Sequence, residues 1–161
     1  DAALATGVPR VVQESVAMVY TDAGDRWIDE ESPVDHYPIA VGNHAAEASA
    51  RRFTDSGGVG VVLRFGLFYG VGAAHSEQLM ALARRRFGFR AGRPGAYVSS
   101  IHLADAAGAV VSALEIGSGT YNIVDDLPVT KKNHTAALAG AVGKHPYVTG
   151  PPSCSANAPR R

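Results

Sequence analysis

The chain has 161 residues, 46% of them hydrophobic, which suits one domain of ordinary size with a buried core. Lysine plus arginine number 15, as do aspartate plus glutamate, so a formal net charge of zero argues against nucleic acid or an anionic membrane as partner. A single cysteine, Cys154, and no apolar run near the roughly 20 residues that span a bilayer predict a cytoplasmic protein without disulfides or a membrane partner.

The first part of the chain alternates between strand and helix patterns. Residues 1–9 read as the last turn of a helix, stopped by a glycine and a proline. The apolar, β-branched stretch 10–20 predicts a strand, and the polar stretch 21–38 predicts a loop. The alanine-rich stretch 39–56 predicts a helix, and 59–65 (VGVVLRF) predicts a buried strand.

The same alternation continues to residue 143. We expect a helix near 76–87, a strand around 96–101, a helix near 103–116, a strand at 120–124 and a helix near 131–142. Strands that alternate with helices favour a parallel sheet covered on both faces. Residues 144–161 are rich in proline, serine and small residues, and we expect them to be a disordered tail.

Four segments carry a resemblance to a known family. RVVQESVAMVY, GVVLRFGLFYGVG, YVSSIHLADAAGAVVSAL and GTYNIVDDLPVTKKNHTAALAGAVG have the order and spacing of segments in the NAD-dependent epimerase/dehydratase family, the extended short-chain dehydrogenases/reductases. The resemblance covers residues 1–143. It implies an α/β, Rossmann-like parallel sheet with flanking helices, substrate-binding elements near the carboxyl end, and NAD or NADP as cofactor.

The resemblance is to the C-terminal half of that family only. Its members open with a strand, a G-x-x-G-x-x-G turn and a helix, where glycines let the backbone approach the dinucleotide phosphates. The sequence SGGVGVV at 56–62 precedes a strand instead of following one, so it does not serve as that motif. We therefore expect an incomplete sheet without the N-terminal dinucleotide-binding strands, and self-association through the strand edge that this exposes at 10–19.

Catalysis in the family uses a serine or threonine and a Tyr-x-x-x-Lys pair, which the resemblance places at Ser15 and Tyr37. Ser15 lies one residue before the family position, and Val41 stands where the lysine is expected. His36 and His44 could supply the missing positive charge, since histidine titrates near neutrality. The alternative is that Tyr37 and these histidines are structural, and that Ser15 satisfies backbone groups.

The end of the strand at 59–65 is the candidate cofactor contact. Ligands of open α/β sheets bind beyond the carboxyl ends of the strands. The resemblance places Arg64, Phe65, Gly66, Leu67 and Phe68 beside the nicotinamide. Because a buried arginine must be paired, a structural ion pair of Arg64 with a loop carboxylate is equally compatible with the sequence.

The resemblance places substrate-binding residues at His75, Arg90, Arg93 and Tyr97. Guanidinium groups suit phosphate, so a nucleotide sugar would fit the arginines between 84 and 93, although arginines near the end of a helix are also favoured by its dipole.

Three other residues are expected to be structural. Asp105 can cap a helix, Asn122 resembles a buried amide, and Thr130 suits the N-cap of the last helix.

Three functions remain open from the sequence. The first is an NAD(P)-dependent epimerase, dehydratase or reductase that acts on a small hydroxyl-bearing substrate. The second is a non-catalytic family member that senses a dinucleotide or metabolite, and the absence of lysine between residues 1 and 130 favours it. The third is an inactive fragment. No His-x-x-x-His pair or G-x-S-x-G elbow supports a metal site or a nucleophilic triad.

Overall fold

The computed structural model describes residues 2–88, 93–143 and 148–149. The chain divides into two compact units. The first comprises Asp1–Phe68 and Ser99–Asp125, and the second comprises Tyr69–Val98 and Asp126–Arg161.

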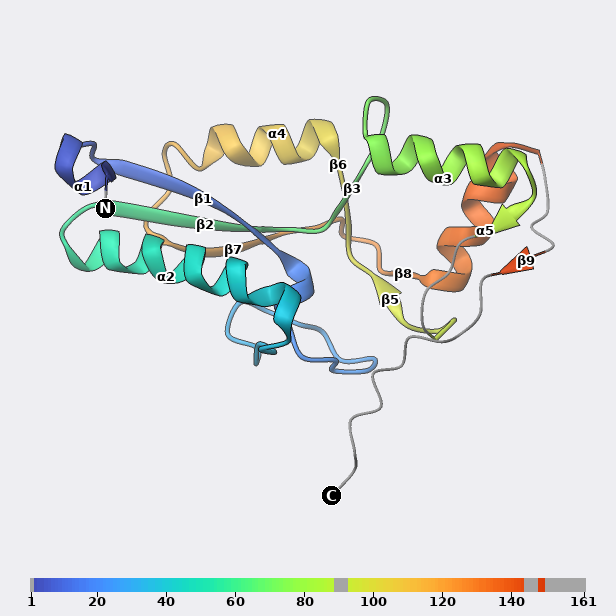
Figure 1. The fold of residues 1–161 in the computed structure, drawn as a ribbon, viewed down its shortest axis with the longest axis horizontal. Helices are drawn as coiled ribbons and strands as arrows, with labels where there is room; N and C mark the ends of the chain where they lie inside the picture. The colour runs from blue at the N-terminus through green and yellow to red at the C-terminus, as the bar shows by residue number, and fades with distance from the viewer. Residues whose placement is uncertain (1, 89–92, 144–147, 150–161) are drawn as a thin grey trace, which may run out of the picture. The chain divides into compact units, whose positions relative to one another are not determined.

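The first unit is built on a three-stranded parallel sheet. Its strands are β1 (Arg10–Val16), β2 (Val59–Phe65) and β7 (Gly119–Ile123), in the order β1-β2-β7. Helices α2 (Val41–Asp55) and α4 (Leu103–Ser112) lie on opposite faces of this sheet (Figure 1). The predicted α/β class, a parallel sheet with flanking helices, is confirmed.

Short elements complete the first unit. They are α1 (Ala2–Thr6), the 3-10 turns η1 (Ala17–Val19) and η2 (Pro38–Ala40), and β3 (Leu67–Tyr69), which pairs with β6 (Ser100–His102) and ends at the boundary with the second unit.

Alternate residues of β2 face opposite sides of the sheet, as the period of a strand requires. Val61, Leu63 and Phe65 form an apolar cluster with Ile101 and with the α4 side, where the buried residues are Ala106 and Ala113. The side of β2 that carries Gly60 and Arg64 faces α2 instead. This apolar cluster therefore lies between the sheet and α4, and Val62, Ala50 and Phe53 are buried on the α2 side.

Helix α2 lies unusually close to β2. A Cβ atom built at Gly60 would lie 2.3 Å from the carbonyl oxygen of Ala50, so only glycine fits there. The Thr54 hydroxyl accepts a hydrogen bond from the Gly60 N–H at 3.0 Å. Because Gly60 and Ala50 are small, α2 lies close enough to β2 for side chains of the helix to contact the strand.

The described residues of the second unit form two helices and two short strand pairs. Helix α3 (Ala74–Arg84) packs on α5 (Lys131–Ala141), β5 (Tyr97–Val98) pairs antiparallel with β8 (Val129–Thr130), and β4 (Phe87–Gly88) pairs with β9 (Val148–Thr149).

Backbone N–H groups in the first turn of α5 have hydrogen-bond acceptors. The Thr130 hydroxyl accepts from the Asn133 N–H at 3.2 Å, so its predicted role as N-cap is confirmed. The Lys131 and Lys132 N–H groups donate to the carbonyls of Ala96 and Pro94 at 2.8 and 2.9 Å. This helix N-terminus is therefore already occupied by backbone oxygens.

Two expected elements differ in the structure. The predicted strand 96–101 breaks at Ser99, whose carbonyl accepts from the Leu67 N–H at 2.8 Å, so the chain changes partner from β8 to β3. The predicted helix 76–87 begins at Ala74 and ends at Arg84, where Arg86 has a φ of 64°. In the predicted tail, Val148–Thr149 forms β9, and 144–147 and 150–161 lie outside the described residues.

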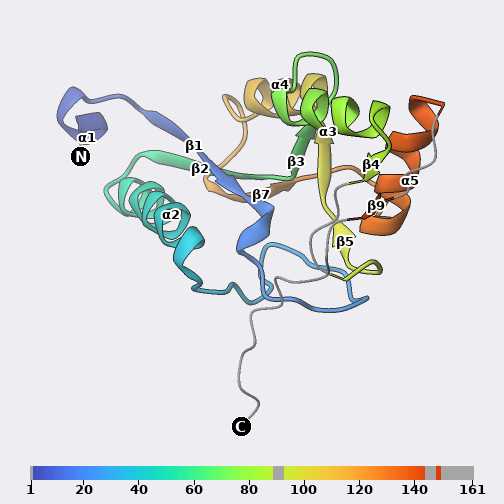
Figure 2. The ribbon, with the colours of Figure 1, turned by 45° about the vertical axis from the view of Figure 1, so that its right-hand side comes forward.

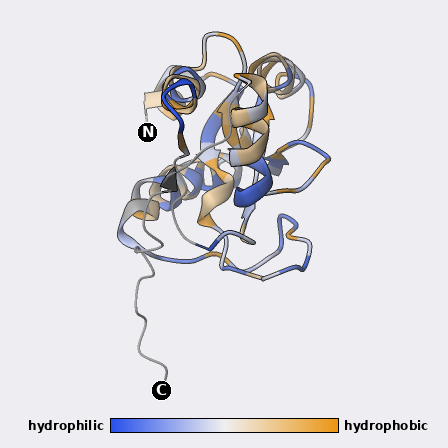
Figure 3. Ribbon diagram, turned by 90° about the vertical axis from the view of Figure 1, so that its right-hand side faces the viewer, coloured by the Kyte–Doolittle hydropathy of each residue, from blue (hydrophilic) through white to orange (hydrophobic). Residues whose placement is uncertain are grey.

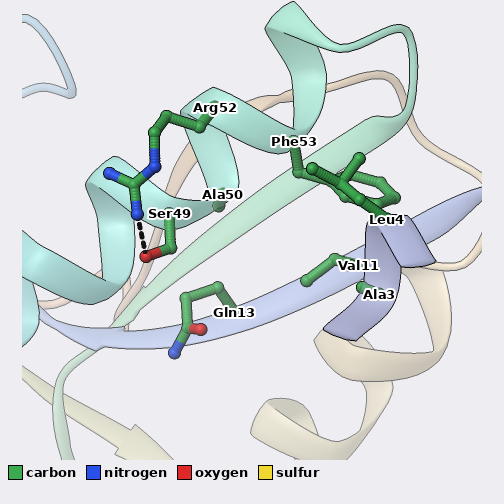
Figure 4. Close-up of a pocket in the computed structure, with 8 residues that line it drawn as sticks. All are labelled: Ala3, Leu4, Val11, Gln13, Ser49, Ala50, Arg52 and Phe53. Atoms are coloured by element: carbon green, nitrogen blue, oxygen red, sulfur yellow. Dashed lines mark hydrogen bonds between the residues drawn. The ribbon is translucent and has the colours of Figure 1, made fainter. Parts of the chain in front are cut away.

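Strand β1 lies at the edge of the three-stranded sheet (Figure 2), and a pocket borders it (Figure 4). In the described part of the chain no strand pairs with β1 on the side away from β2. The pocket lies between α1, β1 and α2 and is lined by Ala3, Leu4, Val11, Gln13, Ser49, Ala50, Arg52 and Phe53. Self-association through this edge stays a prediction. Among the described residues, no helix is long and apolar enough to cross a bilayer.

Candidate functional site

Three polar residues stand at the same level of three neighbouring strands. Ser15 of β1 pairs with Arg64 of β2, and Arg64 pairs with Asn122 of β7. Each lies in the last two residues of its strand, at the carboxyl edge of the sheet where α/β proteins bind ligands. The sequence analysis had selected all three separately, and the parallel register brings them together.

Glu47 of α2 contacts two of these residues, Ser15 and Arg64, from the face of the sheet that α2 covers. Its Oε1 accepts from the Ser15 hydroxyl at 2.6 Å and from Arg64 Nε at 2.9 Å, and its Oε2 accepts from Arg64 Nη2 at 2.7 Å. The exposed fraction is 1% for Glu47 and 4% for Arg64. Arg64 and Glu47 therefore form a bidentate ion pair inside the protein.

Tyr20 completes the cluster, just after η1. Its hydroxyl accepts from Arg64 Nη1 at 2.8 Å and donates to Asn122 Oδ1 at 2.7 Å. The Arg64 guanidinium carbon lies 4.8 Å from the centre of the Tyr20 ring, within the range of a cation–π contact. We call Ser15, Tyr20, Glu47, Arg64 and Asn122 the polar cluster.

The pKa values of the ion pair follow from these contacts. Burial by itself would raise the pKa of the Glu47 carboxyl, but the hydrogen bonds from Arg64 and Ser15 lower it below its usual value. The hydrogen bonds to Glu47 outweigh burial and raise the pKa of Arg64. Both groups are therefore ionised at neutral pH. Every buried side-chain nitrogen and oxygen of the described residues has a hydrogen-bond partner.

The polar cluster changes how two predicted site residues are interpreted. Ser15 is fully buried, and its hydroxyl is engaged by Glu47. Arg64 forms the ion pair that was one of its two predicted roles, but its partner is Glu47 on helix α2 and not a loop carboxylate. In this structure both residues hold the carboxyl edge of the sheet together. Their assignment to catalysis and to cofactor binding stays a prediction.

Tyr37, the predicted catalytic tyrosine, precedes η2. Its hydroxyl donates to the carbonyl of Met18. Burial, with the Asp35 carboxylate adding to it, raises the pKa of Tyr37 above its ordinary value. Val41, at the lysine position, is 60% exposed and supplies no cation. Tyr37 therefore stays protonated at neutral pH, with its hydroxyl hydrogen directed to the Met18 carbonyl, and its catalytic role stays a prediction.

His36 and His44, which flank Tyr37 in the sequence, have their rings in contact. Their ring centroids are 4.6 Å apart, and His44 Nε2 lies 2.7 Å from the carbonyl oxygen of Asp35. His44 thus fastens the start of α2 to the segment before it. The structure shows no contact from either ring to the Tyr37 hydroxyl among the interactions of the described residues.

The residues predicted to border the nicotinamide are largely used by the fold. The N–H groups of Gly66 and Leu67 donate to the carbonyls of Ile123 and Ser99 at 3.0 and 2.8 Å. The rings of Phe65 and Phe68 contact each other, with centroids 5.3 Å apart. The Arg64 side chain and the N–H groups of Gly66 and Leu67 are therefore engaged within the fold. The contact of these residues with a dinucleotide stays a prediction.

The predicted substrate residues belong to the second unit. His75 lies on α3, Arg93 precedes β5, and Tyr97 lies on β5, whereas Arg90 lies outside the described residues. Burial, with His75 adding to it, lowers the pKa of His134 on α5. Substrate binding by His75, Arg90, Arg93 and Tyr97 stays a prediction.

Asp105 is not the cap of its helix. The side chain of His102 accepts from the Ala104 N–H at 3.2 Å and caps α4, and Asp105 lies in the first turn.

Sequence reasoning missed Glu47, Tyr20 and Glu30. Glu30 lies in the loop after β1, and its Oε1 accepts from the Asn122 N–H at 2.8 Å, at the outer edge of β7. The one available signal was Arg64, because a charge at the end of an apolar strand requires an acidic partner. Nothing in the sequence pattern distinguishes Glu47 from the other carboxylates as that partner.

The fold and this carboxyl edge define a Rossmann-like α/β protein. No family model matches the sequence. A curated relative, the 3-diazoavenalumate denitrifying reductase of a Streptomyces species, is 32% identical over 99% of this chain and 54% of its own length. MoeE5 in complex with UDP-glucose and NAD superposes with a TM-score of 0.79 at 26% identity, over 92% of this chain and 52% of its own. The Thermus thermophilus UDP-glucose 4-epimerase complex with NAD gives 0.76 at 24% identity, over 90% and 52%.

The chain is thus similar in sequence to a reductase and in fold to NAD-dependent epimerases, so the predicted resemblance to the NAD-dependent epimerase/dehydratase family, the extended short-chain dehydrogenases/reductases, is confirmed. The chain spans about half the length of the curated relative and of the solved structures that it matches, consistent with the C-terminal half that its motifs indicate.

Proposed function

We propose that this chain forms the carboxyl-terminal part of an NAD(P)H-dependent reductase that acts on a small carbonyl compound and yields a hydroxyl-bearing product. The observation that carries the proposal is the setting of Tyr37, which has Val41 in place of the partner lysine and the Asp35 carboxylate nearby; burial and this carboxylate both raise its pKa. A protonated tyrosine is a poor base for a substrate hydroxyl and a suitable acid for a carbonyl oxygen.

This argument separates the reactions of the family. Epimerisation and dehydration that begin by oxidising a hydroxyl need a base to remove its proton, and Tyr37 does not provide one at neutral pH. Reduction of a carbonyl needs a hydride and a proton. When bound, a reduced nicotinamide supplies the hydride, which adds to the carbonyl carbon while the carbonyl π electrons move to oxygen. That oxygen then takes a proton from Tyr37 or from water.

One relative supports this choice, whereas the solved relatives include epimerases and dehydratases. The curated relative bears the name of a reductase. Solved relatives are complexes with NAD, and a human epimerase family protein of the same fold, with a TM-score of 0.75, is a complex with NADPH. Either cofactor is therefore consistent with the proposal. Arg64, Gly66 and Leu67 are not expected to hold the phosphates, because the Arg64 side chain and the N–H groups of Gly66 and Leu67 are engaged within the fold.

A second candidate is a non-catalytic family member that binds a dinucleotide or metabolite as a sensor. Val41 in place of the lysine and the internal pairing of Arg64 both favour it. It predicts binding without turnover.

The test compares the two directions of hydride transfer in the polypeptide lengthened at its amino end by the residues encoded upstream. We expect NAD(P)H oxidation with aldehydes and ketones, and alcohol oxidation at least tenfold slower at neutral pH. Tyr37→Phe should lower kcat for reduction roughly 100-fold if its proton is used. Cofactor binding without turnover in either direction would favour the sensor, and faster alcohol oxidation would contradict the proposal.

A further inference from the structure

The loop between β1 and η2 is fixed to the carboxyl edge of the sheet. Its two ends are paired, because the Thr21 N–H donates to the Pro33 carbonyl at 2.9 Å and the Asp35 N–H donates to the Val19 carbonyl at 2.7 Å. Between them, Glu30 reaches the backbone of Asn122 on β7. We call residues 21–36 the edge loop. It begins at the end of β1 and is anchored near the end of β7.

Further hydrogen bonds shape the edge loop from within. Asp22 Oδ1 accepts from the Gly24 N–H at 2.9 Å, and the Ser32 hydroxyl donates to Asp29 Oδ1 at 2.7 Å. The loop therefore holds a defined conformation at the edge where ligands of such sheets bind.

Trp27 stands out within this fixed loop. Its side chain is 81% exposed, more than any other aromatic residue that the structure describes. A tryptophan is large and usually contributes to a core or an interface, so leaving it in water forgoes a large apolar burial. Ile28 beside it is also exposed, as is Met18 on η1 at the end of β1.

The charge around Trp27 restricts what it can bind. The edge loop contains six acidic residues and one arginine, Arg26, and Figure 3 shows it largely in hydrophilic colours. An anionic group brought to this loop would be repelled, whereas a neutral or cationic group would not.

We propose that Trp27 is a substrate-recognition residue that stacks on a flat, uncharged ring of the substrate at the carboxyl edge of the sheet. The proposal rests on the proposed function, since it places the substrate at that edge, and it adds the class of substrate. The substrate then carries an aromatic ring close to the group that is reduced, and its ionised groups, if any, lie away from the edge loop.

Trp27 is the single tryptophan of the chain, so its fluorescence reports this position alone. We would titrate the chain with cinnamyl alcohol, with cinnamate, which adds a negative charge to the same ring system, and with 3-cyclohexyl-1-propanol, which has no aromatic ring. We expect saturable quenching by cinnamyl alcohol, several-fold weaker quenching by cinnamate at low salt, and none by the cyclohexyl alcohol.

Variants connect the binding to the residue. Ligand-observed saturation-transfer NMR should show cinnamyl alcohol binding about fivefold weaker in Trp27→Ala than in the unchanged chain, a loss typical of one aromatic contact. Val111→Ala is the matched control, because Val111 is 66% exposed on α4, away from the carboxyl edge, and should change nothing.

Three results would overturn the proposal: no saturable quenching by cinnamyl alcohol, equal binding of cinnamyl alcohol and cinnamate, or unchanged binding in Trp27→Ala. A blue-shifted, ligand-insensitive emission in the lengthened polypeptide would also overturn it, because Trp27 would then be covered by protein. Since these readouts need no turnover, they fail or succeed independently of the reductase assay.

Discussion

The two faces of the three-stranded sheet differ in the side chains that they bury near its carboxyl edge. Towards α4, Leu63 and Phe65 pack with Ile101 in an apolar cluster. Towards α2, one residue along the same strand, Arg64 is buried in an ion pair with Glu47. The α4 face gains stability from the removal of apolar surface from water, whereas the α2 face combines buried apolar residues, Val62, Ala50 and Phe53, with polar groups that must each keep a partner. Strand β2 thus contributes Leu63 and Phe65 to an apolar cluster on one side and Arg64 to a buried ion pair on the other.

The largest expected effect is the loss of Glu47. Glu47→Ala leaves the Arg64 guanidinium buried without its carboxylate, and we expect the free energy of unfolding to fall by about 3 to 5 kcal/mol. Urea denaturation measures it. Glu115→Ala is the control, because Glu115 is exposed after α4 and should change stability by less than about 0.5 kcal/mol.

A double replacement sharpens the same comparison. If the α2 face needs the charges only because each requires the other, Glu47→Leu combined with Arg64→Met should recover most of the stability lost in Glu47→Ala. A double variant that is as unstable as Glu47→Ala would mean that the buried ion pair has no apolar equivalent.

Next in size is the apolar face. Leu63→Ala removes a side chain that is 1% exposed, and we expect a loss of about 3 kcal/mol from lost burial and the cavity that remains. The same substitution at exposed Leu114 is the matched control. Similar losses at the two positions would contradict the assigned core.

Acid should act on the α2 face before it acts on the α4 face. Because the pKa of Glu47 is lower in the folded protein than its ordinary value, its contribution to stability is present above that ordinary value, about 4.3. The contribution is lost as the pH falls through the lower, folded pKa. Glu47→Gln should therefore flatten the decline of thermal stability below roughly pH 4 relative to the unchanged chain. An identical acid limb in both would contradict the ionised pair.

The smallest expected effect concerns Ser15. Ser15→Ala removes one hydrogen bond to Glu47, and we expect a loss of about 1 kcal/mol and a rise in the pKa of Glu47. If the lengthened polypeptide is an active reductase, this variant also tests the predicted catalytic role of Ser15. A loss of kcat far beyond the loss of stability would restore that role.

The sequence pattern predicted the scaffold better than the contacts on it. Strand β2 and helix α2 are close to their predicted bounds, because an unbroken apolar run and an alanine-rich stretch ended by glycines are strong local signals. Arg64 signalled a buried partner. The identity of that partner, Glu47, depends on how closely α2 approaches β2. A Cβ atom at Gly60 would lie only 2.3 Å from the Ala50 carbonyl oxygen, and no local sequence pattern predicts such a close approach.

The break at Ser99 was equally hidden. The stretch 96–101 reads as one strand because its residues suit a strand throughout. Its hydrogen bonds divide between β8 and β3, segments distant in the sequence. The exposure of Trp27 also arises from the fold of the edge loop, where hydrogen bonds of Glu30 and Thr21 set the path of the chain.

The most direct test of the central claim is a titration of the chain with NADH and NADPH, followed by nicotinamide fluorescence, beside the same titration of the lengthened polypeptide. The claim is that this chain supplies the substrate side of a dinucleotide-dependent reductase and that Arg64 and its neighbours do not hold the phosphates. We predict saturable, micromolar binding by the lengthened polypeptide only. Saturable micromolar binding by the 161-residue chain itself would contradict the claim, because this chain would then hold the dinucleotide without any further residues.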